Sequence, residues 1–247
     1  MGARRAGSRR VWLRRVLVTG ALGSALAAGY MLWLRDSSLV AVREVSVVGV
    51  GSAERDDVVA ALEQAARGMT TLHVREDELR EVASRYPTVR TVSADVSFPN
   101  GLTIEVTERK PVALVDREGK DLPVAGDGTV LPGAATAGLD LPALEAQAER
   151  SATRLVDDAL EQARVLGAAP GPMRPLVEQT TEDDQGVGVV LTDGITLLFG
   201  DASQADAKWA AAAGVLADGE LGGLSYIDLR APDRPAVGGA APAAGAA

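Results

Sequence analysis

The sequence predicts an α+β protein that begins with a single transmembrane helix and continues as two compact domains. An uncharged apolar stretch at 16–34 predicts the helix. Residues 42–110 then show patterns in the order strand, helix, helix, strand, strand, which predicts a small β-α-α-β-β domain. Residues 111–235 alternate strand patterns with further helices, which predicts a mixed α/β domain around a largely antiparallel sheet.

The composition excludes several classes of protein. The chain of 247 residues has no cysteine and one histidine, His73, so disulfides, thiolate metal sites and multi-histidine metal sites are all excluded. All 34 acidic residues lie after position 34, and aromatic residues make up only 3% of the chain. An acidic body with few stacking side chains argues against nucleic-acid binding.

Residues 1–15 form a basic tip with six arginines and no acid, and residues 16–34 follow without a formal charge. A helix over this stretch is about 28 Å long at about 1.5 Å per residue, which matches the hydrocarbon core of a bilayer. Because positive charge stays on the cytoplasmic side, the N-terminus is predicted to be cytoplasmic and the body extracytoplasmic. This describes a single-pass type II protein of the cell membrane.

Two alternatives concern the same stretch. Small residues at 25–27 fit a cleaved signal peptide, although the apolar character that continues through Leu34 favours an uncleaved anchor. Small residues also recur at helical spacing, which is typical of helix pairing in lipid but arises easily by chance in an alanine-rich segment. They are Gly20, Ser24 and Ala28 on one face, and Ala21, Ala25 and Gly29 on the next.

The first domain opens with two closely spaced glycines, Gly49 and Gly51, between a strand and a helix, as a dinucleotide-binding unit does. Such a unit needs one helix and then a parallel strand, whereas here two helices and a hairpin follow. The third small position of the pattern is Glu54, whose carboxylate would repel a pyrophosphate. The glycines are therefore predicted to end a strand and turn the chain.

The elements of this domain follow from short patterns. Ser52 is expected to cap a helix with the apolar stripe Val58, Leu62 and Ala65, and Pro87 ends the second helix. Asn100-Gly101 between two alternating runs is a strong hairpin signal. The predicted ranges are a strand at 42–50, a helix from Ser52, a helix at 75–86, and strands at 92–98 and 102–106.

The second domain is predicted from alternating runs separated by turns, with Asp127-Gly128 and Asp193-Gly194 at two turn tips. Trp209 is expected to anchor the core. The Ala/Gly-rich segment 236–247 cannot bury enough apolar area to offset its ordering entropy and is expected to be a disordered tail. The predicted elements are a strand and turn at 111–120, helices at 149–168 and 203–217, and strands near 174–180, 186–192, 195–199 and 224–230.

No residue pattern predicts catalysis, a cofactor or a metal. His73 stands without a nearby nucleophile pattern, and the acidic run 182–185 lacks the spacing of a calcium loop. A pair of carboxylates for hydrolysis of cell-wall sugars cannot be placed in a cleft from sequence, so an extracytoplasmic wall enzyme has no positive support. The chain is predicted not to be an enzyme.

The order β-α-α-β-β directly outside a membrane span resembles a POTRA domain. Four further stretches resemble the bacterial cell-division family FtsQ/DivIB, and their order and spacing cover nearly the whole chain. They are TERKPVALV at 107–115, DGITLLFG at 193–200, AKWAAAAGVL at 207–216 and YIDLRAPDRPAV at 226–237. The resemblance implies a POTRA domain over 42–110 and an FtsQ-type β domain over 111–235.

The resemblance also implies a function: a non-catalytic scaffold at the division septum that couples division to septal peptidoglycan synthesis. It implies binding to FtsB/FtsL-type coiled-coil proteins and to other divisome membrane proteins, through pairing of an edge strand within 224–237. Alternation places Ile227 and Leu229 inward, and Pro232 is expected to end the pairing strand early. The partner-binding residues implied are Tyr226, Asp228, Arg230, Ala231, Pro232 and Arg234.

An alternative function would use the same kind of binding, in which a sheet edge pairs with an extended chain. POTRA edges bind extended chains, so a membrane-anchored POTRA receptor that passes polypeptides to a secretion or assembly system is the alternative. No barrel pattern follows in this sequence, and the domain is expected on an anchor rather than before a pore. These two features favour the division scaffold.

Overall fold

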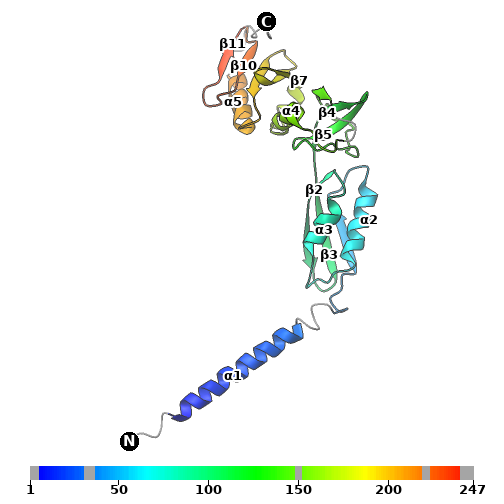
Figure 1. Ribbon diagram of the computed structural model, residues 1–247, viewed down its shortest axis with the longest axis vertical. Coiled ribbons are helices and arrows are strands. Elements are labelled where there is room, and N and C mark those ends of the chain that lie inside the picture. The colour runs from blue at the N-terminus through cyan, green and yellow to red at the C-terminus, as the bar shows by residue number, and fades with distance from the viewer. Residues whose placement is uncertain (1–5, 31–36, 148–151, 219–222, 240–247) are drawn as a thin grey trace. The chain divides into compact units, whose positions relative to one another are not determined.

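The computed structural model describes residues 6–30, 37–147, 152–218 and 223–239 (Figure 1). The chain divides into two compact units. Unit 1 comprises Met1–Val50, Arg55–Arg85 and Thr91–Thr107, and unit 2 comprises Gly51–Glu54, Tyr86–Arg90 and Glu108–Ala247. The short segments 51–54 and 86–90 thus pack with the second unit, although they lie within the predicted first domain.

The first helix, α1, runs from Ala6 to Gly29. It covers the start of the predicted membrane span at 16–34, and residues 31–34 of that span lie outside the described residues. Among the helices that the structure describes, none is both long enough and apolar enough to cross a membrane.

Unit 1 contains the predicted β-α-α-β-β order. Its sheet has the strand order β1-β3-β2, in which β1 pairs in parallel with β3 and β2 forms the hairpin with β3. Leu62, Leu79 and Ile104 are fully buried between the helices and the sheet. The elements are β1 (Glu44–Val48), α2 (Arg55–Ala66), α3 (Glu76–Ala83), β2 (Val89–Ser97) and β3 (Gly101–Glu108).

The two glycines after β1 serve the fold. Gly49 has φ +87°, and a Cβ there would lie 2.1 Å from the carbonyl oxygen of Val106, so only glycine permits this close approach. The backbone N–H groups of Gly51 and Ser52 each donate to the carboxylate of Glu108 at 3.0 Å. The anion held beside the start of α2 is therefore the protein's own side chain.

The prediction that Ser52 caps α2 is wrong. The helix begins at Arg55, and the buried Oγ of Ser52 has no hydrogen-bond partner among the described residues. The backbone N–H groups of Gly51 and Ser52 donate two charge-assisted hydrogen bonds to the Glu108 carboxylate, and the next N–H, that of Ala53, donates to the carbonyl of Gly133 at 3.0 Å.

Unit 2 is built on an eight-stranded sheet with the order β11-β10-β9-β8-β7-β6-β4-β5. Its strands are β4 (Pro111–Arg117), β5 (Lys120–Ala125), β6 (Ala143–Gln147), β7 (Val177–Asp183), β8 (Gly186–Leu191), β9 (Thr196–Gly200), β10 (Tyr226–Asp228) and β11 (Ala236–Gly238). Strand β6 was not predicted from the sequence, and neither was β11.

The sheet is mixed rather than largely antiparallel, which corrects the prediction. The pairs β10/β9, β4/β6 and β6/β7 are parallel, and the other four neighbouring pairs are antiparallel. Helices explain two of the parallel pairs: α4 (Asp157–Gly167) connects β6 to β7, and α5 (Ala205–Ala217) connects β9 to β10. A helix between neighbouring strands returns the chain to the end at which it started.

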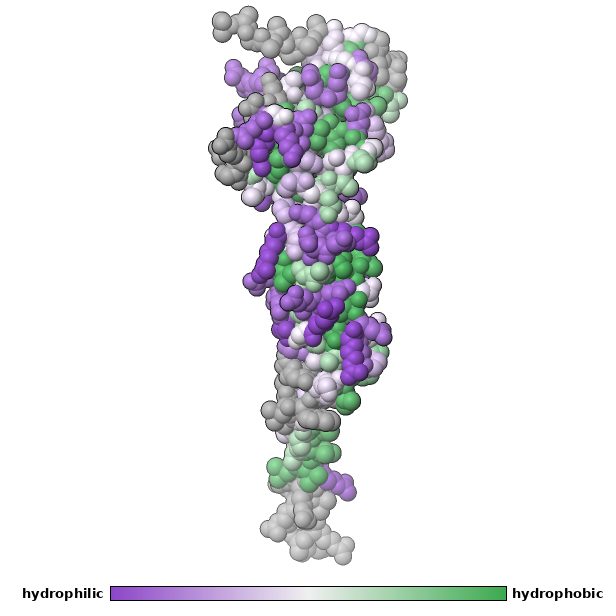
Figure 2. Space-filling view, turned by 90° about the vertical axis from the view of Figure 1, so that its right-hand side faces the viewer, coloured by the Kyte–Doolittle hydropathy of each residue, from purple (hydrophilic) through white to green (hydrophobic). Residues whose placement is uncertain are grey.

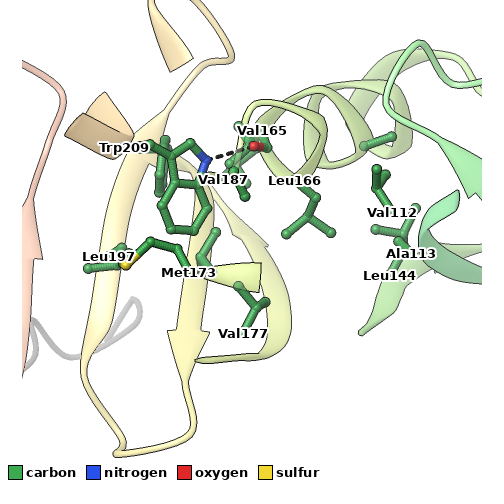
Figure 3. Packing of buried hydrophobic residues seen from close by; sticks show 14 of the residues in the cluster. Val112, Ala113, Leu144, Val165, Leu166, Met173, Val177, Val187, Leu197 and Trp209 are labelled. Carbon is green, nitrogen blue, oxygen red and sulfur yellow. Dashed lines mark hydrogen bonds between the residues drawn. The ribbon is translucent and has the colours of Figure 1, made fainter. Parts of the chain in front are cut away.

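The core of unit 2 lies between this sheet and the two helices (Figure 3). Trp209 on α5 is fully buried, and its Nε1 donates to the carbonyl of Val165 on α4 at 2.8 Å. Its ring lies 5.0 Å from that of Phe199 on β9. The prediction that Trp209 anchors the core is confirmed.

The predicted start of α4 at 149 is wrong, since α4 begins at Asp157. Residues 148–151 lie outside the described residues.

Candidate functional site

The C-terminal end of the sheet differs from the prediction in one decisive way. Strand β10 is interior: it pairs in parallel with β9, where Ile227 opposes Leu197, and in antiparallel fashion with β11, where Ile227 opposes Val237. Residues 236–238 form β11. The prediction that they belong to a disordered tail is therefore wrong. The free edge of the sheet therefore belongs to β11 and not to β10.

The turn between the two strands explains the difference. The N–H of Arg234 donates to the carbonyl of Ala231 at 3.0 Å, and this turn returns the chain alongside β10. Pro232 lies inside the turn, and β10 stops at Asp228, earlier than the predicted strand at 224–230. A three-residue strand offers too little alternation to be recognised in the sequence.

The backbone of β11 faces two ways. The carbonyl of Gly238 accepts from the N–H of Ser225 at 2.8 Å, so the backbone of Gly238 faces β10. In an antiparallel strand the hydrogen-bonding groups of successive residues point to opposite sides. The N–H and C=O of Val237 therefore point to the open side of the sheet, and its side chain is 55% exposed.

The opposite edge of the same sheet is covered. Strand β5 contains Pro123, whose carbonyl accepts from the N–H of Leu131 at 2.8 Å, and Val124 forms an isolated bridge with Val130. A proline and a covering segment are two devices that block pairing at an edge strand. Of the two edges of this sheet, β11 is the one suited to accept another strand.

The residues predicted to bind a partner lie together here. Ile227 and Leu229 are fully buried, which confirms the predicted alternation, whereas Tyr226 and Asp228 are half-buried and Arg230 is exposed. Tyr226 covers Gly238 of β11, since a Cβ at Gly238 would lie 2.4 Å from the tyrosine ring. Of the other predicted residues, Ala231 and Arg234 are exposed in the turn and Pro232 is half-buried.

Asp228 and Arg230 form a bidentate ion pair. The Nη2 of Arg230 lies 2.6 Å from Oδ2 of Asp228, and its Nε lies 3.0 Å from Oδ1. The hydrogen bond from Arg230 holds the pKa of the Asp228 carboxyl below its usual value, and the same bond raises the pKa of the guanidinium. Nη1 of Arg230 also donates to Oε1 of Gln185 at 3.2 Å. The arginine is thereby positioned between the end of β10 and the turn that joins β7 to β8, with 48% of its side chain still exposed.

Sequence reasoning missed a shallow groove of about 170 Å³ on the outer face of strands β7 to β10. Glycines shape it: a Cβ at Gly188 would lie 2.5 Å from Oγ1 of Thr181. The alternating residues Val189 and Leu197 are fully buried in the core, whereas Val190 and Leu198 line the groove, so the groove lies on the face of the sheet away from α4 and α5. Gly-x-Gly at 186–188 was its only signal in the sequence. Its lining consists of Thr181, Asp183, Gln185, Gly186, Val187, Gly188, Val190, Thr196, Leu198, Gly200 and Tyr226.

A β-α-α-β-β unit followed by a mixed sheet with one open edge defines a POTRA protein with a C-terminal β domain. Comparison with known families agrees: residues 40–109 match the FtsQ-type POTRA domain, and residues 113–230 match the C-terminal domain of the cell division proteins FtsQ/DivIB. The chain belongs to the FtsQ/DivIB family. The matched part of the second domain ends at residue 230, so β11 lies beyond it.

Whole proteins give the same result. The chain is 30% identical to cell division protein FtsQ of Streptomyces collinus over 249 residues, which cover 96% of this chain and 92% of that relative. It is 27% identical to FtsQ of Streptomyces bingchenggensis, covering 91% of this chain and 86% of the relative. For FtsQ of Mycobacteroides abscessus the identity is 25%, covering 94% of this chain and 72% of the relative.

Family membership confirms the resemblance seen in the sequence and gives the broad function. The chain is a cell-division protein of a non-catalytic family, and its partners are expected within the division machinery. Relatives of this kind along most of the chain favour the division scaffold over the alternative of a polypeptide receptor.

Proposed function

We propose that this protein is a bitopic membrane scaffold of the division machinery that binds an FtsB/FtsL-type partner by strand pairing and couples division to septal peptidoglycan synthesis. The observation that carries the proposal is the open edge of β11, where the N–H and C=O of Val237 point away from β10. An extended partner segment that lies along this edge continues the sheet.

Main-chain pairing with so short a strand cannot supply the whole affinity. A hydrogen bond contributes about 0.5–1.5 kcal/mol net, and β11 has three residues. Side chains beside the edge must add to it: Arg230 and Arg234 offer exposed positive charge, and Val237 offers apolar surface. Tyr226, Asp228, Ala231 and Pro232 shape the same end of the sheet. A partner segment that carries acidic residues beside its pairing strand fits this surface.

The proposal assigns the basic tip to 1–15, the anchor to 16–34, the POTRA domain to 42–110 and the FtsQ-type β domain to 111–235. Strand β11 extends the β domain to Gly238.

The proposed anchor is supported by the exposure of α1. Leu17, Leu22 and Leu26 are each at least 60% exposed, and Figure 2 shows α1 as a mainly hydrophobic segment where its residues are coloured. Such a surface calls for lipid around it. With six arginines before it, this anchor leaves the N-terminus in the cytoplasm and the body outside, at the septum.

Strand pairing is tested by removing the outward amide alone. Val237→Pro deletes the N–H that faces the open side and leaves the backbone of Gly238 paired with β10. Val237→Ala is the matched control, because it removes the same side chain and keeps the amide. Captured FtsB-like partner should fall at least tenfold for Val237→Pro and at most threefold for Val237→Ala. Equal capture by both variants would place the partner elsewhere.

A further inference from the structure

The end of unit 1 at which β1 begins exposes two large apolar side chains. Phe98, in the turn between β2 and β3, is 71% exposed, and Leu39, just before β1, is 61% exposed. Single exposed apolar residues are ordinary in soluble domains. These two differ because the structure ties the segments that carry them to each other.

Asn100 makes that connection. Its Nδ2 donates to the carbonyls of Leu39 and Ala41, at 3.0 and 2.7 Å. The backbone carbonyl of Asn100 accepts hydrogen bonds from the N–H of Arg43 at 2.9 Å and from the N–H of Glu44 at 3.2 Å. The turn that carries Phe98 is therefore fixed to the stretch that carries Leu39. We call this end of unit 1, defined by Leu39, Phe98 and Asn100, the apolar rim.

Thr71 holds the rim from the other side. Its Oγ1 donates to the carbonyl of Pro99 at 2.7 Å, and the side chain of Thr71 is buried. These bonds fix the backbone of the turn at Pro99 and Asn100, directly after Phe98. The exposed Phe98 is therefore carried by a turn that is anchored to the rest of unit 1.

The proposed anchor would place this rim close to the bilayer. Leu39 lies five residues after Leu34, the last residue of the proposed anchor. A fully extended chain covers at most about 3.5 Å per residue, so Leu39 lies within about 17 Å of the end of the apolar span. The headgroup region fills about 5–8 Å of that distance on each side of the hydrocarbon core.

The charge beside the rim suits a phospholipid surface. Arg43 is exposed, and its Nη2 donates to the carbonyl of Ser38 at 3.2 Å, which holds the guanidinium at the same end of the unit. A phenylalanine and a leucine beside an arginine match the headgroup boundary, where apolar side chains enter the lipid and a cation meets phosphate.

We propose that the apolar rim of the POTRA domain lies in the outer leaflet of the membrane, with Phe98 and Leu39 inserted at the headgroup boundary and Arg43 beside lipid phosphates. This inference rests on the proposed anchor. Two side chains do not hold a free domain on a bilayer, but the anchor keeps the rim at high effective concentration next to it. The contact limits the tilt of the domain on its anchor.

The test uses the full chain, which contains no cysteine, so a single introduced cysteine gives a single label. Ser97→Cys places an environment-sensitive fluorophore next to Phe98 and leaves both rim side chains in place. Thr91→Cys, exposed near the opposite end of β2, is the control position. The protein is reconstituted in vesicles of phosphatidylethanolamine and phosphatidylglycerol that carry a lipid-bound quencher.

The label at 97 should be quenched at least threefold more than the label at 91. Adding Phe98→Asp and Leu39→Asp should lower that quenching to the level seen at 91. Val48→Asp, an exposed apolar position at the other end of β1, should leave it unchanged. Equal quenching at 97 and 91 in a protein that floats with the vesicles would overturn the rim contact alone. A wild-type chain that does not float with the vesicles would overturn the anchor, and the rim contact with it.

Discussion

The Nε and Nη2 groups of Arg230 donate hydrogen bonds to the carboxylate of Asp228, two residues earlier in the chain. The backbone N–H of Arg230 donates to the same carboxylate at 3.0 Å. The pair stands where β10 ends and the turn toward β11 begins. The motif that resembles the division family in the sequence thus has a local structural role, which is to fix the start of that turn.

This pair predicts a pH dependence. Asp228 has a lowered pKa in the folded chain, chiefly through its hydrogen bond with Arg230. Its contribution to stability is therefore present above the unfolded pKa, about 4, and is lost as the pH falls through the lower folded value. Asp228→Asn should cost about 0.5–1 kcal/mol at pH 7, because the pair is partly exposed, and close to nothing in strong acid. Urea unfolding at both pH values measures the difference, and a cost that is the same at both would contradict it.

A second carboxylate responds to acid in the same direction. Burial alone would raise the pKa of Asp127, but hydrogen bonds from Arg109 and Thr129 lower it to about 2. Stability from this group is present above about pH 4 and is lost as the pH falls through about 2. Asp127→Asn should flatten the acid limb of a plot of stability against pH. Asp121→Asn, at an exposed position of β5, should leave that limb unchanged.

The glycines after β1 give a matched pair of variants. A Cβ at Gly49 meets the carbonyl oxygen of Val106 at 2.1 Å and also requires φ +87°, whereas a Cβ at Gly51 meets only the Glu108 side chain, at 3.6 Å. Gly49→Ala should therefore destabilise unit 1 by about 1–3 kcal/mol, the range for a strained backbone conformation. Gly51→Ala should cost less than about 1 kcal/mol. Thermal unfolding followed by circular dichroism measures both, and similar costs would contradict the role given to Gly49.

Much of this fold is readable from local patterns. The Asn100-Gly101 turn, the Asp193-Gly194 turn and the burial of Ile227 and Leu229 all follow from alternation and turn chemistry. Local patterns do not show which strands from distant parts of the chain pair with each other. The parallel pairing of β10 with β9 depends on α5, and β11 is too short for any pattern. For that reason the sequence placed the edge strand of the sheet at 224–230, whereas the last strand of the sheet is β11.

Lys208 illustrates a determinant that no sequence pattern reveals. Its Nζ is buried in unit 2 and donates to the carbonyls of Phe199 and Asp201, at 2.9 and 3.0 Å, and to Oδ1 of Asp201 at 2.9 Å. Lys208→Met keeps the length of the side chain but leaves the buried carbonyl of Phe199 without this donor. It should cost about 1–3 kcal/mol of unfolding free energy. Lys110→Met, at an exposed position, should cost less than about 0.5 kcal/mol, and equal costs would remove the role proposed for Lys208.

The last prediction separates β11 from the residues that follow it. A chain that ends after Arg230 loses the turn and β11, and so exposes β10 as a new edge. A chain that ends after Gly239 keeps β11, together with the bond from Ser225 Oγ to the carbonyl of Gly239 at 2.8 Å. Because the proposed pairing surface is the edge of β11, the longer chain should capture an FtsB-like partner as the full chain does, and the shorter chain should lose at least tenfold. Both should retain the circular dichroism of a folded sheet. Loss of capture by the longer chain would instead assign binding to residues 240–247, and full capture by the shorter chain would assign it to a surface outside β11.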